Sequence, residues 1–200
     1  PSDAAVGMPV LGSWAGAALQ TELESRGWQV RTVDLPTVHA DDPRGLHMTD
    51  DADAIAAAID ESGGPVAVVA HSYGGVPTTQ GATSDSVVHI VYVAAFVLDE
   101  GESLLGAVGG VAPSWWVVDG PLATAGTAAE PATGLFFADV DDDTAVAAVG
   151  RLKAQSSAAF SDELTAVAWR DKDTTYVITE QDVVFPLPAQ EALAARSGST

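Results

Sequence analysis

Two apolar runs on either side of a short turn sequence most constrain the fold of this chain. Residues 65–70 are PVAVVA, residues 87–94 are VVHIVYVA, and the segment between them begins HSYGG. Parallel strands that helices cover on both faces show such continuous apolar runs, whereas half-exposed strands alternate. The sequence therefore predicts an α/β fold with a mostly parallel sheet and helices on both faces.

The rest of the core continues the alternation of strands and helices. Gly27 and the Gly63-Gly64 pair follow helical patterns and predict where two of the helices end. The other expected strands are 3–7, 28–34 and 174–179, and the other expected helices are 14–26, a segment from Asp50 to the Gly63-Gly64 pair, and 187–196. This order favours parallel strands that are joined by helices.

Residues 100–165 break the alternation. They are rich in Gly and Ala, and the run Asp141-Asp142-Asp143 predicts the start of a helix that leads into AVAAVGRLKAQSSAAF. Carboxylates are favoured at such a helix start by the helix dipole. We interpret this stretch as a cap that is inserted into a core made of residues 1–99 and 166–200.

Four aromatic side chains of the expected cap are candidates for a substrate pocket. They occur as two adjacent pairs, Trp115-Trp116 and Phe136-Phe137. Aromatic rings commonly line small-molecule sites, but the same rings can seal the small core of a cap. The sequence leaves both interpretations open.

The charge balance limits the partners of the chain. The sequence has 28 acidic and 8 basic residues, a net charge of −20, which repels nucleic acid and anionic membranes. It has no cysteine, which excludes disulfides, thiolate metal sites and a cysteine nucleophile. With no signal peptide and no apolar run as long as a membrane span, we expect a soluble cytoplasmic protein with a small-molecule substrate, and a homodimer stays open.

Metal and cofactor sites are not expected. The acidic clusters at 41–42, 50–53 and 141–143 lack the spacing of a calcium loop, and the histidines lack a metal-ligand spacing. No glycine-rich phosphate loop follows a strand. We interpret the acidic clusters as solvated faces and helix starts.

The segment VVAHSYGG, residues 68–75, carries the clearest chemical signal. An apolar strand leads directly into Ser72 and then into a helix, with the small residues Ala70 and Gly74 on either side of the serine. This is the context of a nucleophile elbow, in which a tight turn exposes the serine hydroxyl at the carboxyl edge of the sheet. A helix N-terminus at the same place favours developing negative charge. Ser72 is therefore a candidate nucleophile, and a structural turn serine is the alternative.

Separate blocks of the sequence, in the right order and spacing, resemble the small bacterial α/β-hydrolases related to plant esterases and hydroxynitrile lyases. The resemblance spans nearly the whole chain. The blocks are SW (13–14), SRGWQVRTVDLP (25–36), AHSYGG (70–75), VYVAAFVLDEGESL (91–104), FFADV (136–140), QSSAAF with LTAVAWR (155–170) and TYVITEQDVVFP (175–186). The resemblance implies the α/β-hydrolase fold with a helical cap.

The resemblance also implies roles for individual residues. Ser72 matches the nucleophile, and the backbone amides of Tyr73 and Met8 match the oxyanion hole. Val6 stands where the family has the histidine of its His-Gly pair, which is a departure in this half of the hole. Asp182 matches the acid that orients a catalytic histidine, and an ordinary turn aspartate is the alternative.

The family order is nucleophile, acid and then histidine, but this sequence has no histidine after His89. The chain ends where the family's last strand would begin, so the expected fold lacks the last strand and helix. Three interpretations follow. The chain is an incomplete form of a full hydrolase, a ligand-binding protein without catalysis, or a hydrolase with an unconventional base.

The four histidines differ in their suitability as a base. His39 follows the second expected strand, near the expected mouth of the site, and is one candidate. His71 precedes the serine in an extended strand, so its side chain should point the opposite way, into the fold. His47 and His89 are expected to be structural.

We therefore expect a serine hydrolase that acts on a small carboxylic ester or lactone through an acyl-enzyme on Ser72. One alternative is a non-catalytic binding protein that keeps the pocket. The other is a lyase acting on cyanohydrins, which a lysine in the pocket would support. Neither Lys153 nor Lys172 stands at a position that the sequence connects to the site.

Overall fold

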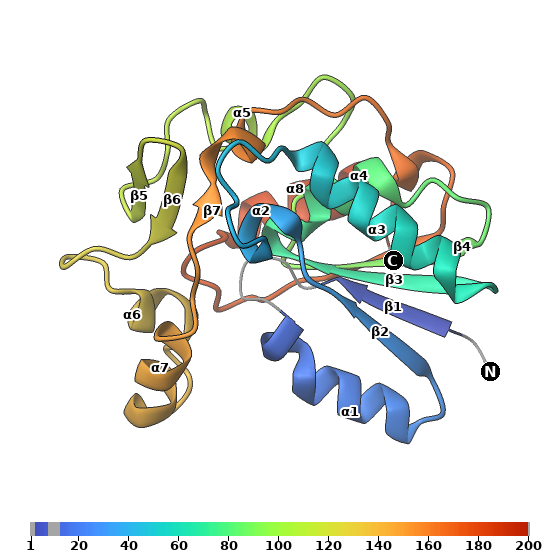
Figure 1. Cartoon of the computed structure of the whole chain (residues 1–200), viewed down its shortest axis with the longest axis horizontal. Coiled ribbons are helices and arrows are strands. Elements are labelled where there is room, and N and C mark those ends of the chain that lie inside the picture. The colour runs from blue at the N-terminus through green and yellow to red at the C-terminus, as the bar shows by residue number, and fades with distance from the viewer. Residues whose placement is uncertain (1–2, 8–12, 200) are drawn as a thin grey trace.

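The computed structural model describes residues 3–7 and 13–199 of the chain. A five-stranded sheet forms its centre in the order β2-β1-β3-β4-β8, and every neighbouring pair of strands is parallel (Figure 1). The strands are β1 (Asp3–Gly7), β2 (Gln29–Val33), β3 (Val66–His71), β4 (Val87–Val93) and β8 (Thr174–Val177). Each overlaps a strand that the sequence predicts.

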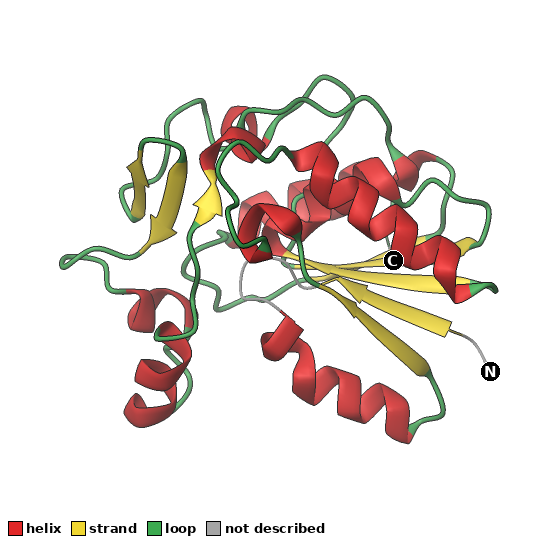
Figure 2. Cartoon of the chain, viewed as in Figure 1, coloured by secondary structure: helices red, strands yellow, loops and turns green. Residues whose placement is uncertain are grey.

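Helices flank this sheet on two sides. Figures 1 and 2 show α1 below the sheet, while α3 and α4 lie above it. The helices of the core are α1 (Ala17–Ser25), preceded by the 3-10 turn η1 (Ser13–Gly16), α2 (Pro36–His39), α3 (Met48–Ser62), α4 (Gly75–Gly81) and α8 (Leu187–Arg196). The α/β prediction of a parallel sheet with helices on both faces is confirmed.

The two faces of the sheet differ in burial. In β3 the side chains of Val66, Val68 and Ala70 are fully buried, whereas the residues between them are half-buried. The buried face packs in one cluster with Ile55 and Ile59 of α3. On the other side, α1 has no buried residue in the described structure. The apolar run of β3 is therefore fully covered on one face only.

Residues 100–165 form a separate set of elements to the left of the main sheet in Figure 1. Three short strands make an antiparallel sheet in the order β5-β6-β7. The elements are α5 (Leu104–Ala107), β5 (Trp116–Asp119), β6 (Leu122–Ala125), α6 (Ala132–Phe136), α7 (Asp142–Val149), β7 (Gln155–Ser156) and the 3-10 turn η3 (Ser157–Phe160). The sequence pattern does not predict this small sheet.

The acidic run before α7 begins a helix, as the sequence predicts. The Asp141 carboxylate accepts hydrogen bonds from the Thr144 backbone N–H at 3.0 Å and from its hydroxyl at 2.7 Å. The helix ends at Val149, and Gly150 follows as its C-cap. The expected continuation beyond Gly150 is wrong, because that segment forms β7 and η3 instead.

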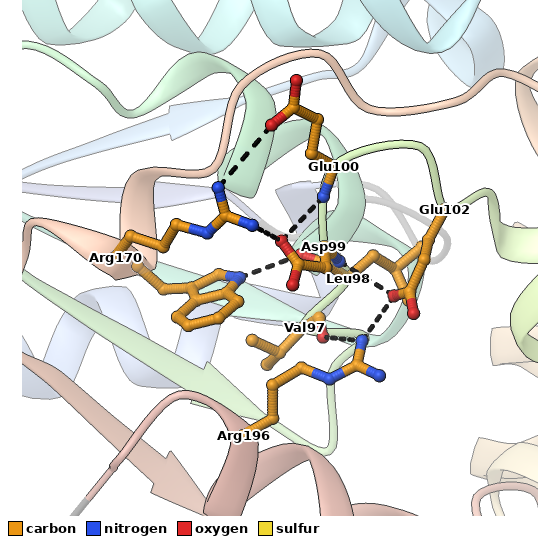
Figure 3. Close-up of polar contacts among 8 residues, drawn as sticks. Val97, Leu98, Asp99, Glu100, Glu102, Arg170 and Arg196 are labelled. Atoms are coloured by element: carbon orange, nitrogen blue, oxygen red, sulfur yellow. Dashed lines mark hydrogen bonds and ion pairs between the residues drawn. The ribbon is translucent and has the colours of Figure 1, made fainter.

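Two arginines hold the loop by which the chain leaves β4 for residues 100–165 (Figure 3). Arg170 pairs with Asp99 and, at 3.6 Å, with Glu100. Arg196, the last residue of α8, pairs with Glu102. We call these five residues the arginine clamp.

Backbone contacts complete the clamp. The indole Nε1 of Trp169 donates to the Leu98 carbonyl at 2.8 Å, and the Arg196 Nη1 donates to the Val97 carbonyl at 3.3 Å. The loop after β4 is therefore attached both to α8 and to the segment before β8.

Candidate active site

Ser72 occupies a strained turn between β3 and α4. Its φ angle is +54°, a left-handed conformation that non-glycine residues seldom adopt. The 3-10 turn η2 (Ser72–Gly74) begins at this residue, directly after β3 ends at His71. Such strain persists only where the surroundings impose it, and it gathers at functional sites. This is the conformation that the nucleophile-elbow motif predicts.

Close packing behind the turn depends on Gly75. A Cβ atom at this position would lie 2.1 Å from the Phe96 carbonyl oxygen and 2.9 Å from its nitrogen. The Phe96 amide in turn donates to the Ser72 carbonyl at 3.1 Å. Only glycine allows the backbone after β4 to approach the turn this closely.

The turn also places one of the two expected oxyanion donors. Tyr73 is the second residue of η2, and amides in the first turn of a helix have no partner within that helix. Tyr73 lines the same cavity as Ser72. Met8, the other expected donor, lies outside the described residues.

Ser72 opens into a cavity of about 470 Å³. Of the four cap aromatics proposed from the sequence, Trp115, Trp116 and Phe136 line this cavity. Phe137 is not among the lining residues, and its ring instead lies 6.3 Å from that of Phe136. The other aromatic residues that line the cavity are Tyr73, Phe96, Phe160 and Phe185.

The aromatic side chains contact one another as well as the cavity. Trp116 lies 4.8 Å from Phe160, and Trp115 meets Phe136 edge to face at 5.6 Å, both measured between ring centroids. These rings therefore form a small core and also one wall of the cavity. That a substrate binds against them stays a prediction.

Asp182 lies in the loop after β8, at the carboxyl edge of the sheet. One carboxylate oxygen accepts hydrogen bonds from the Val184 and Phe185 amides at 2.8 and 2.9 Å. The other accepts from the Thr179 hydroxyl at 3.1 Å. These bonds fix the orientation of the carboxylate. They also connect it to the cavity, because Val184 and Phe185 are lining residues.

Asp182 acts electrostatically on His71. Burial lowers the pKa of His71, and the negative charge of Asp182 acts in the opposite direction. The imidazole is therefore held neutral at physiological pH. His71 is not among the described residues that line the cavity.

The other three histidines are also absent from the lining residues in the described part of the chain. His47 pairs with Asp162 at 3.0 Å, and His89 contacts the Thr175 hydroxyl at 2.9 Å. His39 lies in α2 with its Nε2 3.8 Å from an Asp34 carboxylate oxygen. The structure thus brings Ser72 together with the aromatic residues but with none of these imidazoles.

Asp51 contacts Tyr73, a residue that lines the cavity, and the sequence did not identify this contact. Asp51 belongs to the acidic run that we interpreted as a solvated face or a helix start. The run does begin α3, but the Asp51 side chain is fully buried. The carboxylate accepts hydrogen bonds from the Thr37 amide at 2.9 Å, the Thr37 hydroxyl at 2.6 Å and the Tyr73 hydroxyl at 2.8 Å. Burial raises the pKa of Asp51 to about 6, although the bonds from Thr37 and Tyr73 oppose the shift.

Lys153 also departs from the sequence-based expectation. It lines the cavity, although the sequence offers no signal for this position. Lys172 lies elsewhere, 4.0 Å from Asp85.

Within the described residues, no group of three His, Cys, Asp or Glu side chains is arranged to hold a metal ion. In the same part of the chain, no helix combines the length and apolarity needed to cross a bilayer.

A comparison with protein-family models identifies one family. A model described as the alpha/beta hydrolase family matches residues 11–200. The chain is 29% identical over 178 residues to a probable hydrolase, R7, from Phoma sp. (strain ATCC 20986 / MF5453), covering 84% of this chain and 72% of that protein.

Solved structures share the fold. A pyrethroid hydrolase from Sphingobium faniae JZ-2 aligns with a TM-score of 0.79 at 19% identity, over 97% of this chain and 84% of its own. A polyneuridine aldehyde esterase mutant aligns with a TM-score of 0.76 at 18% identity, over 100% of this chain and 88% of its own.

Proposed function

Because the chain belongs to the alpha/beta hydrolase family, we propose that it hydrolyses a small carboxylic ester or lactone through an acyl-enzyme on Ser72. The observation that carries the proposal is the strained Ser72 turn, with φ at +54°, which opens into an aromatic cavity of about 470 Å³. The names of two similar proteins, a pyrethroid hydrolase and an esterase, support the same class of reaction.

In the proposed reaction the Ser72 oxygen attacks the carbonyl carbon and its proton passes to a general base. The amides of Tyr73 and Met8 stabilise the oxyanion, since donors aimed at developing charge lower the barrier. The alkoxide leaves with the proton from the base, and water then releases the acid from Ser72. Asp182 orients the base and stabilises its charged form.

The apolar lining suggests an apolar acyl or alcohol group in the substrate. We expect Trp115→Ala to raise the KM for long-chain esters about tenfold while changing the KM for acetates little, because the lost contact is mainly hydrophobic. Phe137→Ala is the matched control, since Phe137 neighbours Phe136 but does not line the cavity. An unchanged KM across the ester series would remove Trp115 from the binding site.

Labelling with a fluorophosphonate probe tests the proposed function. Such probes react with a serine that a base activates, so wild-type protein should be labelled and Ser72→Ala should not. The intact mass, compared with 20.4 kDa for this sequence, identifies the species that reacts. His71→Gln and His39→Gln then assign the base within this sequence. Equal labelling of wild type and Ser72→Ala would refute the acyl-enzyme.

Two other functions each rest on one observation. None of the four histidines lines the described cavity, which favours a ligand-binding protein without turnover. A small ester recovered intact from a tight complex would support that function.

Lys153 does line the cavity, which favours a lyase acting on cyanohydrins. Release of cyanide that is lost in Lys153→Met would support the lyase.

A further inference from the structure

The proposed reaction does not use the buried carboxylate of Asp51. No Lys, Arg or His is among its hydrogen-bond or ion-pair partners in the described structure, so its charge is held by neutral donors alone. Burying a carboxylate is costly unless well-directed hydrogen bonds replace its hydration.

The hydrogen bonds around Asp51 form a directed chain across four elements. The Gln155 amide of β7 donates to the Thr37 hydroxyl at 3.1 Å, and that hydroxyl donates to Asp51 of α3. From the other side, the Tyr73 hydroxyl of η2 donates to the same carboxylate oxygen. A carboxylate at this position accepts from all three donors, whereas an asparagine would place its NH2 group against either the Thr37 amide or the two hydroxyls.

Both ends of this chain reach the cavity, because Tyr73 and Gln155 are lining residues. Tyr73 directly follows Ser72, and its ring also contacts Phe160 edge to face at 6.1 Å. Fixing the Tyr73 side chain therefore limits rotation of the peptide unit beside the serine.

The charge at Asp51 reduces stability at neutral pH. Burial raises the pKa of Asp51, so the folded state binds its proton more tightly than the unfolded state does. The charge of Asp50 acts in the same direction, because it raises the pKa of Asp51 further. Asp162, which pairs with His47, raises the pKa of Tyr73. A group that costs stability beside a catalytic site is typical of a stability–activity trade-off.

We propose that Asp51 is a positioning residue: it holds the Tyr73 side chain, and thereby the backbone amide beside Ser72, and through Thr37 and Gln155 it connects β7 to the same point. The inference rests on the proposed function only for the role of that amide as an oxyanion donor.

Hydrogen exchange tests the positioning without any need for catalysis. The Gly75 amide donates to the Ser72 and Tyr73 carbonyls, so its exchange reports the order of the turn. We expect faster exchange in a peptide covering residues 70–76 for Asp51→Asn and for Tyr73→Phe. The matched control is Asp53→Asn, an exposed position on the same helix, which should exchange like wild type.

The rate of fluorophosphonate labelling tests the consequence for chemistry. Asp51→Asn and Tyr73→Phe should each label about tenfold more slowly, because small displacements of reacting groups cost that much or more. The double variant should be no slower than the single variants, because both changes act through the same hydrogen-bond network. Asp51→Asn should nevertheless melt at or above the wild-type temperature at neutral pH, which separates positioning from a structural role.

The outcomes are distinguishable. If the exchange rate of the turn is unchanged in both variants, the inference is overturned. It is also overturned if the labelling rate falls only in proportion to the loss of folded protein. If wild-type protein labels no faster than Ser72→Ala, the proposed function fails. In that case hydrogen exchange alone tests the positioning role of Asp51. Faster exchange in Asp51→Asn and Tyr73→Phe would support this role, and exchange at the wild-type rate would contradict it.

Discussion

Two polar clusters hold loops at the carboxyl edge of the main sheet, and they differ in solvent exposure and in charge balance. The arginine clamp pairs both signs of charge, and the Arg196 and Glu102 side chains remain 34% and 39% exposed. The cluster around Asp51 is closed to solvent and holds one negative charge between neutral donors.

The difference follows from the cost of removing charge from water. Exposed ion pairs keep most of their hydration, so they form at little cost and contribute little. A buried charge loses its hydration and recovers it only through well-directed hydrogen bonds. We therefore expect substitutions in the buried cluster to have large, pH-dependent effects, and those in the arginine clamp to have small, salt-dependent effects.

The largest effect is expected for Thr37→Val. This nearly isosteric change removes a donor to the Asp51 carboxylate and leaves the Gln155 amide without its acceptor. We expect a loss of about 3 kcal/mol in the free energy of unfolding by urea, because a charged acceptor and a buried donor each lose a partner.

The matched control is Thr78→Val. Thr78 is equally buried, but its hydroxyl has no hydrogen-bond partner in the described structure. It should therefore lose nothing or gain slightly. Equal losses in the two valine variants would show that burial of the threonine, and not the hydrogen bond, causes the effect.

The second effect is a pH dependence with a defined sign. The pKa of Asp51 is about 6 in the folded state against an ordinary value of 3.8, so the folded state binds the proton more tightly. This tighter binding of the proton adds to the free energy of unfolding. The contribution is fully present below about pH 4 and is lost as the pH rises through about 6. Its size is about 3 kcal/mol, from about two pKa units at 1.36 kcal/mol each.

Urea unfolding across this pH range measures the effect. Asp51→Asn should lack the decline between about pH 4 and pH 6, whereas Asp53→Asn should keep it. Parallel pH profiles for all three proteins would mean that Asp51 keeps an ordinary pKa in the folded state.

The smallest effect is expected in the arginine clamp. Arg196→Met keeps the apolar stem but removes the pair with Glu102 and the bond to the Val97 carbonyl. We expect a loss of about 1 kcal/mol that shrinks as KCl is added, because salt screens half-exposed pairs. Arg44→Met is the control for the change in net charge, since its pair with Asp42 is more exposed. A loss independent of KCl would assign the effect to packing.

Local patterns in the sequence predicted the elements that place Ser72. The apolar run of β3, the small residues around Ser72 and the following helix depend on interactions within a few residues, and these patterns are visible in the sequence. Helix α8 spans Leu187–Arg196, the range that the sequence predicts. The small antiparallel sheet was missed, because its strands have only two to four residues and no clear alternation.

The sequence by itself predicted the parallel sheet, the strained serine turn and the acidic cap of α7, because the apolar pattern, backbone sterics and short-range capping are all visible in it. Only the tertiary structure decided which charges are buried. Asp50 and Asp51 are adjacent in one acidic run, yet Asp50 caps α3 by accepting the His47 amide while Asp51 is enclosed with Thr37 and Tyr73. The tertiary structure also decided that Lys153 and Phe185 line the cavity, because separate segments of the chain meet there. Burial depends on contacts between residues far apart in the chain, and the sequence pattern around each residue does not contain them.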